Sequence, residues 1–198
     1  EVRPGAEDYP RYMANYVEKP RGIHAVRVLK DKTDFTLESL IEAAYDSALV
    51  AFDPLLPELI ALKDEASVAP ETREAIAHLS GWDTRFALDS TQTSLAVFWG
   101  EALMREARPL AAAANEDIYD YLASQITDEQ RIAALENAMA TLNDGFGSWQ
   151  VPWGEINRYQ RNDGAIVQQF DDSKPSLPVA FASARWGSLA SFGSRSYP

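Results

Sequence analysis

Apolar residues recur three or four positions apart through most of the first 145 residues, a spacing typical of helices that bury one face. The clearest run follows Thr36, with apolar residues at positions 37, 40, 41, 44, 48 and 49. Threonine is a favoured N-cap, so this run predicts a helix over 37–49. A shorter run predicts a helix over 21–31.

Prolines, glycines and capping residues mark the helix boundaries further along the chain. Pro57 and Pro70 suit the first turn of a helix, whereas Pro109 predicts the end of one. Thr127 and Gln130 form a capping-box pattern, and Gly145 suits the end of the helix that this box opens. The helices predicted in this way cover residues 58–65, 71–79, 93–105, 118–122 and 127–142.

The hydrophobic pattern changes after residue 145. Residues 156–161 and 165–170 have strand character and flank Asn162-Asp163-Gly164, which has the composition of a tight hairpin turn. Residues 179–186 predict a further strand. We therefore expect antiparallel strands between about 155 and 190.

These elements predict an α+β fold, with a mainly helical segment over about 21–143 followed by antiparallel strands. Residues 1–20 contain three prolines and three tyrosines and predict an extended segment laid over a surface. The helical region then covers 21–145, and a β-rich region covers 146–198. A chain of 198 residues is long enough to bury a sizeable core.

The composition of the chain argues against several kinds of binding partner and site. Lys and Arg number 18 against 30 Asp and Glu, a formal net charge of −12 that argues against binding to nucleic acid or to an anionic membrane. No stretch approaches the ~18 consecutive apolar residues of a membrane span. The absence of cysteine excludes disulfides, thiolate metal sites and a cysteine nucleophile.

Residue spacing alone supports no catalytic site. His24 and His78 stand far apart without a metal-ligand pattern, so both are interpreted as structural. Asp171-Asp172 lacks the loop pattern of a calcium site and is interpreted as a solvated turn. Ser188 lacks the Gly-x-Ser-x-Gly pattern of an elbow nucleophile.

Several segments, in a fixed order, resemble the β-chain of the penicillin amidase family of N-terminal nucleophile hydrolases. Pro152 to Arg158 in particular resembles the acyl-homoserine lactone and aculeacin-type acylases more than the penicillin G branch. The segments are Asp8-Tyr9-Pro10, Arg21 with Val26-Arg27-Val28-Leu29, Leu79-Ser80-Gly81-Trp82-Asp83, Val151 to Arg158, Arg185 to Leu189, and Gly193-Ser194-Arg195.

The resemblance implies a precursor cleaved into α and β chains, folded as a larger αββα enzyme of which this chain is an internal part. The new N-terminal Ser of the β-chain is then the nucleophile, and its own α-amine is the base. The family's Ser and its oxyanion Asn map outside this sequence. The chain by itself is therefore expected to be inactive.

Arg21 is the candidate site residue, because the resemblance maps an active-site Arg of the family onto it. A guanidinium in that place would hold the oxyanion Asn and the surroundings of the α-amine through several planar hydrogen bonds, which Lys cannot reproduce. The alternative is an ordinary surface salt bridge.

The resemblance also implies partners and a location. The partners are the remaining α-chain and β-chain segments of the precursor and a small N-acyl amide substrate, such as an acyl-homoserine lactone or a β-lactam. We expect a periplasmic or secreted enzyme without a cofactor; the calcium ligand of the penicillin G branch is not matched at 11–16. The alternative from another class is a non-catalytic helical binding module.

Overall fold

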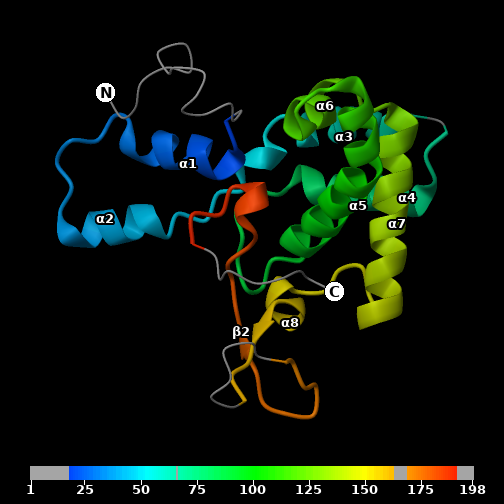
Figure 1. Ribbon diagram of the computed structural model, residues 1–198. Helices are drawn as coiled ribbons and strands as arrows, with labels where there is room; N and C mark the ends of the chain where they lie inside the picture. The colour runs from blue at the N-terminus through cyan, green and yellow to red at the C-terminus, as the bar shows by residue number, and fades with distance from the viewer. Residues whose placement is uncertain (1–17, 66, 163–168, 191–198) are drawn as a thin grey trace.

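The computed structural model describes residues 18–65, 67–162 and 169–190, which form a helical body with a two-helix arm beside it (Figure 1). Short 3-10 turns also occur in the described part of the chain, and two of them contact the arm. The elements are α1 (Pro20–Leu29), α2 (Leu37–Ala44), η2 (Val50–Phe52), α3 (Leu56–Ala61), η3 (Leu62–Asp64), α4 (Pro70–Ser80), α5 (Thr91–Ala114), α6 (Ile118–Ser124), α7 (Asp128–Phe146), α8 (Trp153–Ile156), β1 (Arg158–Tyr159), β2 (Leu177–Pro178) and η4 (Ala184–Trp186).

Helix α5 is the centre of the body and packs against α4, α6, α7 and α8. Its N-terminus is capped by Ser90, whose side chain accepts from the Thr93 amide. The fully buried Trp99 of α5 donates from its ring nitrogen to the Arg131 carbonyl of α7, 3.1 Å away. Trp186 of η4 also enters this core and stacks on Phe52 with ring centroids 4.9 Å apart. The last described residues are therefore anchored in the helical core.

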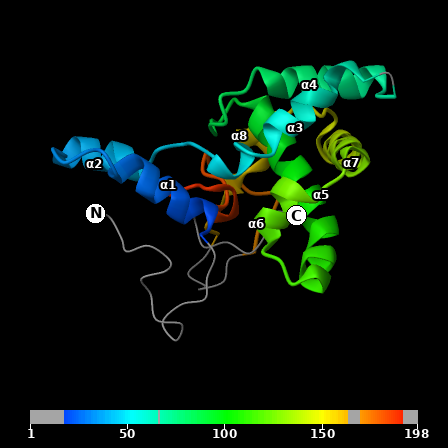
Figure 2. The ribbon, with the colours of Figure 1, turned by 90° about the horizontal axis from the view of Figure 1, so that it is seen from above.

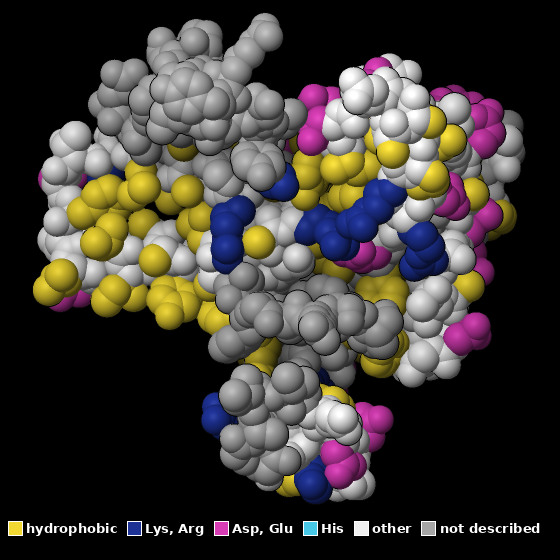
Figure 3. All heavy atoms as spheres, viewed as in Figure 1, with side chains coloured by type: hydrophobic (Ala, Val, Ile, Leu, Met, Phe, Trp, Pro, Cys, Tyr) yellow, Lys and Arg dark blue, Asp and Glu magenta, His cyan; other side chains and the backbone are white. Residues whose placement is uncertain are grey.

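The arm consists of α1 and α2, which lie to one side of the other helices in both views (Figures 1 and 2). Helix α1 packs against η2 and η4. Helix α2 has the predicted N-cap at Thr36, which forms a capping box with Ser39, but none of the residues of α2 is buried. Its apolar side chains are exposed, Leu37 by 78% and Ile41 by 60%. Figure 3 shows hydrophobic side chains gathered over this arm.

The helices predicted to end at 49 and at 145 end at other residues. The helix predicted over 37–49 ends at Ala44, because the backbone beyond it pairs with another segment: Leu49 donates to the Thr84 carbonyl at 2.8 Å, and Ala48 forms a bridge with Arg85. The helix predicted to close at Gly145 runs to Phe146 and ends at Gly147, whose φ of 79° suits glycine.

Pro109 does not end its helix, contrary to the prediction, and α5 continues to Ala114. Proline removes one hydrogen bond, the one to the carbonyl four residues earlier. Pro109 and Arg105 are both exposed, so water can satisfy that carbonyl. Ala107 and Ala111 on the opposite face are buried, and their packing holds the helix together.

The predicted β-rich region is much smaller in the structure. Strands β1 and β2 form a two-stranded antiparallel sheet in which Arg158 faces Pro178. Within the described part of the chain, β1 pairs with 177–178. The predicted hairpin turn and most of the strand predicted over 165–170 lie outside the described residues. The strand predicted over 179–186 is wrong, because β2 ends at Pro178, residues 179–183 lie in no strand, and η4 forms over Ala184–Trp186.

The α+β class is confirmed, with a mostly helical chain and a small antiparallel sheet. The extended segment predicted for 1–20 lies almost entirely outside the described residues. Its last residue, Pro20, is the first residue of α1, where its fixed φ favours helix initiation.

Candidate functional site

Arg21 lies in the first turn of α1 and holds the segment that follows η4. Its Nε donates to the Ser188 carbonyl at 3.1 Å, and its Nη2 donates to the Leu189 carbonyl at 2.8 Å. Neither contact is an ion pair. Two donors of one planar group engage neighbouring carbonyls, so the orientation of the guanidinium is restricted.

Gly187 allows the chain to turn into this position. Its φ of 112° is unfavourable for residues with a side chain. A Cβ built on it would lie 2.9 Å from the Val50 amide nitrogen of η2. The close approach brings the backbone after Trp186 against the arm, where consecutive carbonyls face α1.

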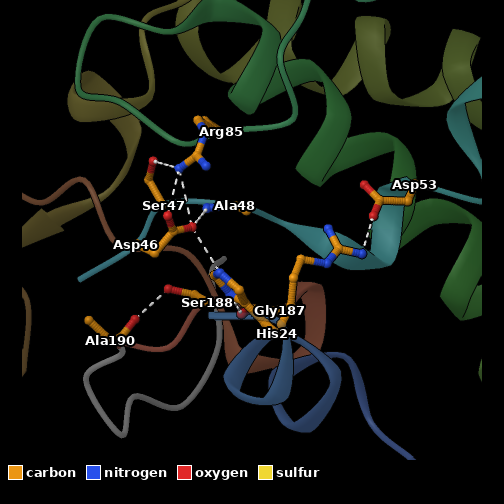
Figure 4. Close-up of polar contacts among 10 residues, drawn as sticks. His24, Asp46, Ser47, Ala48, Asp53, Arg85, Gly187, Ser188 and Ala190 are labelled. Carbon is orange, nitrogen blue, oxygen red and sulfur yellow. Dashed lines mark hydrogen bonds and ion pairs between the residues drawn. The ribbon is translucent and has the colours of Figure 1, made fainter. Parts of the chain in front are cut away.

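His24 lies one turn after Arg21 on the same helix and is fully buried. Its Nδ1 is 2.7 Å from the Gly187 carbonyl oxygen, and its Nε2 is 2.8 Å from Asp46 Oδ1 (Figure 4). The first turns of α1 therefore contact the carbonyls of three successive residues, 187, 188 and 189.

Asp46 is placed by the same backbone pairing that ends α2. The Phe86 amide donates to the Ser47 carbonyl at 3.0 Å, which brings the loop carrying Arg85 beside Asp46. Arg85 Nη1 lies 3.1 Å from each carboxylate oxygen of Asp46, and the Ala48 amide donates to Oδ1 at 3.0 Å (Figure 4). His24, Asp46 and Arg85 thus form a continuous polar chain from α1 to the body.

The pKa of Asp46 is lowered overall. Partial burial raises it, but hydrogen bonds from the Ala48 amide, Arg85 and His24 and the charge of Arg85 together lower it by more. A carboxylate whose folded pKa is below its unfolded value adds stability above the unfolded pKa, and loses that contribution as the pH falls through the folded pKa.

Replacing Asp46 with Asn should therefore lower stability at pH 7 and flatten the acid side of the stability profile. The measurement is urea unfolding at a series of pH values from 7 down to 3. Asp172→Asn is the control, because Asp172 is an exposed turn residue and surface changes of this kind usually alter stability by less than ~0.5 kcal/mol. Equal acid sensitivity of the Asp46→Asn variant and the parent would contradict the prediction.

A comparison with protein-family models identifies the chain. The penicillin amidase model matches residues 2–186 of the 198. The chain belongs to the penicillin amidase family. The family's description is that of an amide hydrolase, and the match covers Arg21 and His24 and ends at Trp186, just before the carbonyls that these two residues contact.

Other residues considered from the sequence take supporting places in this penicillin amidase family chain. His78 Nε2 lies 2.8 Å from the Thr91 hydroxyl and so links α4 to α5; burial lowers the pKa of His78, although Glu74 opposes this. Ser188 is fully buried and its hydroxyl donates to the Ala190 carbonyl, so it is not presented as a nucleophile. Asp171 accepts hydrogen bonds from Ser173 in an exposed turn.

Within 18–65, 67–162 and 169–190, no three His, Asp or Glu side chains gather as metal ligands would. Among the helices of that part of the chain, none combines the length and apolar character of a membrane span.

The sequence predicts Arg21 as a candidate site residue but does not predict the polar residues near it, His24, Asp46 and Arg85. The family resemblance predicts Arg21, and the motif Arg185 to Leu189 supports the same resemblance, but nothing in the sequence links that motif to Arg21. His24 and Asp46 are 22 residues apart, and Arg85 is a further 39 from Asp46. No local spacing rule joins residues at these separations, so the chain His24-Asp46-Arg85 had no sequence signal.

Proposed function

We propose that this chain is part of an N-terminal nucleophile acylase that hydrolyses the amide bond of an N-acyl substrate, such as an acyl-homoserine lactone or a β-lactam. The observation that carries the proposal is the match of the penicillin amidase model to residues 2–186. The resemblance of Pro152 to Arg158 supports the acyl-homoserine lactone and aculeacin-type branch. A periplasmic or secreted location is part of the same proposal.

The proposed reaction proceeds by acyl transfer. The hydroxyl of an N-terminal Ser, supplied by another segment of the enzyme, attacks the amide carbonyl while its own α-amine takes the proton. The amine product leaves with that proton, and water then hydrolyses the acyl ester. Arg21 is proposed to hold the surroundings of the reacting centre, which its restricted guanidinium suits.

The proposed partner is the rest of the same enzyme. The apolar face of α2, formed by Leu37, Leu40 and Ile41, is exposed by 47–78%. An amphipathic helix gains most of its stability from packing that face, so an uncovered one is expected to be buried in the complete enzyme. The remaining α-chain and β-chain segments are the proposed cover.

The function is tested with the complete, processed enzyme on a panel of acyl-homoserine lactones of increasing chain length and of penicillins. We expect release of the free amine from at least one class, and its loss when the N-terminal Ser is replaced by Ala. This chain expressed alone should release none. If the amide bond of every acyl-homoserine lactone and penicillin in the panel stays uncleaved, with the Ser in place and the precursor cleaved, the proposal is refuted.

The partner is tested on the exposed face of α2. Leu37→Gln combined with Ile41→Gln should weaken co-purification of this chain with the remaining segments, and it should reduce binding of a hydrophobic dye to the chain alone. Leu177→Gln is the matched control, because Leu177 is 68% exposed but lies in β2, away from the arm. Equal effects of the two changes would argue against α2 as the contact.

A further inference from the structure

His24 makes two contacts that a neutral imidazole cannot make together. A neutral ring has one N–H donor and one nitrogen that only accepts. The partner of Nδ1 is the Gly187 carbonyl oxygen, 2.7 Å away, and a carbonyl cannot donate. The partner of Nε2 is Asp46 Oδ1, 2.8 Å away. Both nitrogens must donate unless Asp46 carries a proton.

The surroundings of Asp46 favour its ionised form. Besides His24, the carboxylate accepts from the Ala48 amide and from Arg85, and all of these are donors. A protonated Asp46 would have to give up one of these contacts. The proton therefore belongs on His24, which becomes a fully buried cation paired with Asp46.

The other charged groups near α1 already have partners. Asp53, just after η2, pairs with Arg27 at 2.7 Å. Arg185 of η4 pairs with Glu101 of α5, with a contact of 2.7 Å. Asp46, itself shared with Arg85 at 3.1 Å, is thus the counter-charge of His24 within the described residues.

We infer that His24, as an imidazolium, is a positioning residue that fixes the 187–189 backbone against α1 and thereby sets the orientation of Arg21. The carbonyl that His24 holds immediately precedes the two carbonyls that Arg21 holds. If the Gly187 carbonyl is released, the turn that presents the Ser188 and Leu189 carbonyls loses its fixed point. The positioning part of this inference rests on the proposed role of Arg21; the charge of His24 does not.

Neutron diffraction from crystals of the complete, processed enzyme at neutral pH tests the charge directly, without any variant. We expect deuterium on both nitrogens of His24, directed at the Gly187 carbonyl and at Asp46. His78 is the internal control, because its partner is the Thr91 hydroxyl, which can donate as well as accept; it should carry a single deuterium. A single deuterium on His24, or deuterium on Asp46, would overturn the inference.

A double-mutant cycle tests the positioning role. In the enzyme with Arg21 intact, His24→Gln should lower kcat on the order of 10-fold, since a charged hydrogen bond is lost. In the Arg21→Ala enzyme, the same change should have no further effect on kcat. Equal fold-changes in the two backgrounds would mean that His24 acts independently of Arg21 and would overturn the positioning role.

A second variant and an independent measurement cover the outcomes that the cycle alone would leave open. Should His24→Gln fail to fold, Asp46→Asn replaces it, because it keeps His24 and removes only the counter-charge. An Arg21→Ala enzyme with unchanged kcat would count against the proposed role of Arg21, while the neutron map would still report the charge of His24. Failure of the two proposals can therefore be told apart.

Discussion

Replacing Arg21 with Ala should slow amide hydrolysis by the processed enzyme by about 100- to 1000-fold in kcat, as is typical when a preorganised donor near developing charge is lost. Folding should change little, because the Arg21 side chain is exposed and changes of exposed side chains usually alter stability only slightly. Arg21→Lys should restore little of the activity, since an ammonium cannot engage two carbonyls in one plane. Initial rates with saturating substrate measure the effect.

Arg27→Ala is the matched control for Arg21. Arg27 lies on the same helix and pairs with Asp53, but the two side chains are 51% and 37% exposed. Exposed pairs of this kind are worth ~0–1 kcal/mol, so kcat should stay near the parent value. Mass spectrometry of both variants first establishes that the precursor was cleaved. A cleaved Arg21→Ala enzyme with parental kcat would refute the assignment of Arg21.

Replacing Gly100 with Ala should destabilise the chain by about 1–3 kcal/mol, the usual cost of overpacking a core. A Cβ at Gly100 would lie 2.6 Å from the nearest carbon of the Trp186 ring. Trp186 is fully buried, stacks on Phe52 and donates to Glu101 at 3.1 Å, so it cannot move aside without losing contacts. Urea unfolding with an unchanged m-value would measure the loss.

Gly145→Ala separates this packing effect from helix propensity. Gly145 also lies inside a helix, α7, but a Cβ there would meet nothing within 4 Å. Alanine should stabilise this position by roughly 0.5–1 kcal/mol, since it reduces the freedom of the unfolded chain. If both variants shifted the unfolding midpoint in the same direction, close packing at Gly100 would not be the cause.

Most helix starts could be predicted from the sequence, because the signals for a helix start are local. Thr36 and Thr127 cap their helices through amides three residues away, and Pro57 and Pro70 lie in first turns. Helix ends were less predictable, because packing competes with the local signal. Phe146 packs edge-on against Phe98 of α5, and α7 continues past Gly145 to include it.

Strand pairing is even less predictable from the local sequence than helix ends are. Alternation predicts that a segment can form a strand, whereas its pairing depends on which backbone lies beside it. The hairpin turn predicted at 162–164 lies largely outside the described residues and stays a prediction. In the structure, Arg158–Tyr159 pairs with Leu177–Pro178. Trp186, predicted as the last residue of a strand, lies in the helical core, where it is fully buried.

The sequence by itself determined the helical character of the chain, most of its helix starts, its family and the candidate residue Arg21, because these depend on local patterns and ordered motifs. Only the tertiary structure decided what Arg21 contacts. The carbonyls of Ser188 and Leu189 lie 167 and 168 residues away from it in the chain. Backbone carbonyls have the same chemistry at every residue, so only folding, through the left-handed turn at Gly187, selects which of them meet α1.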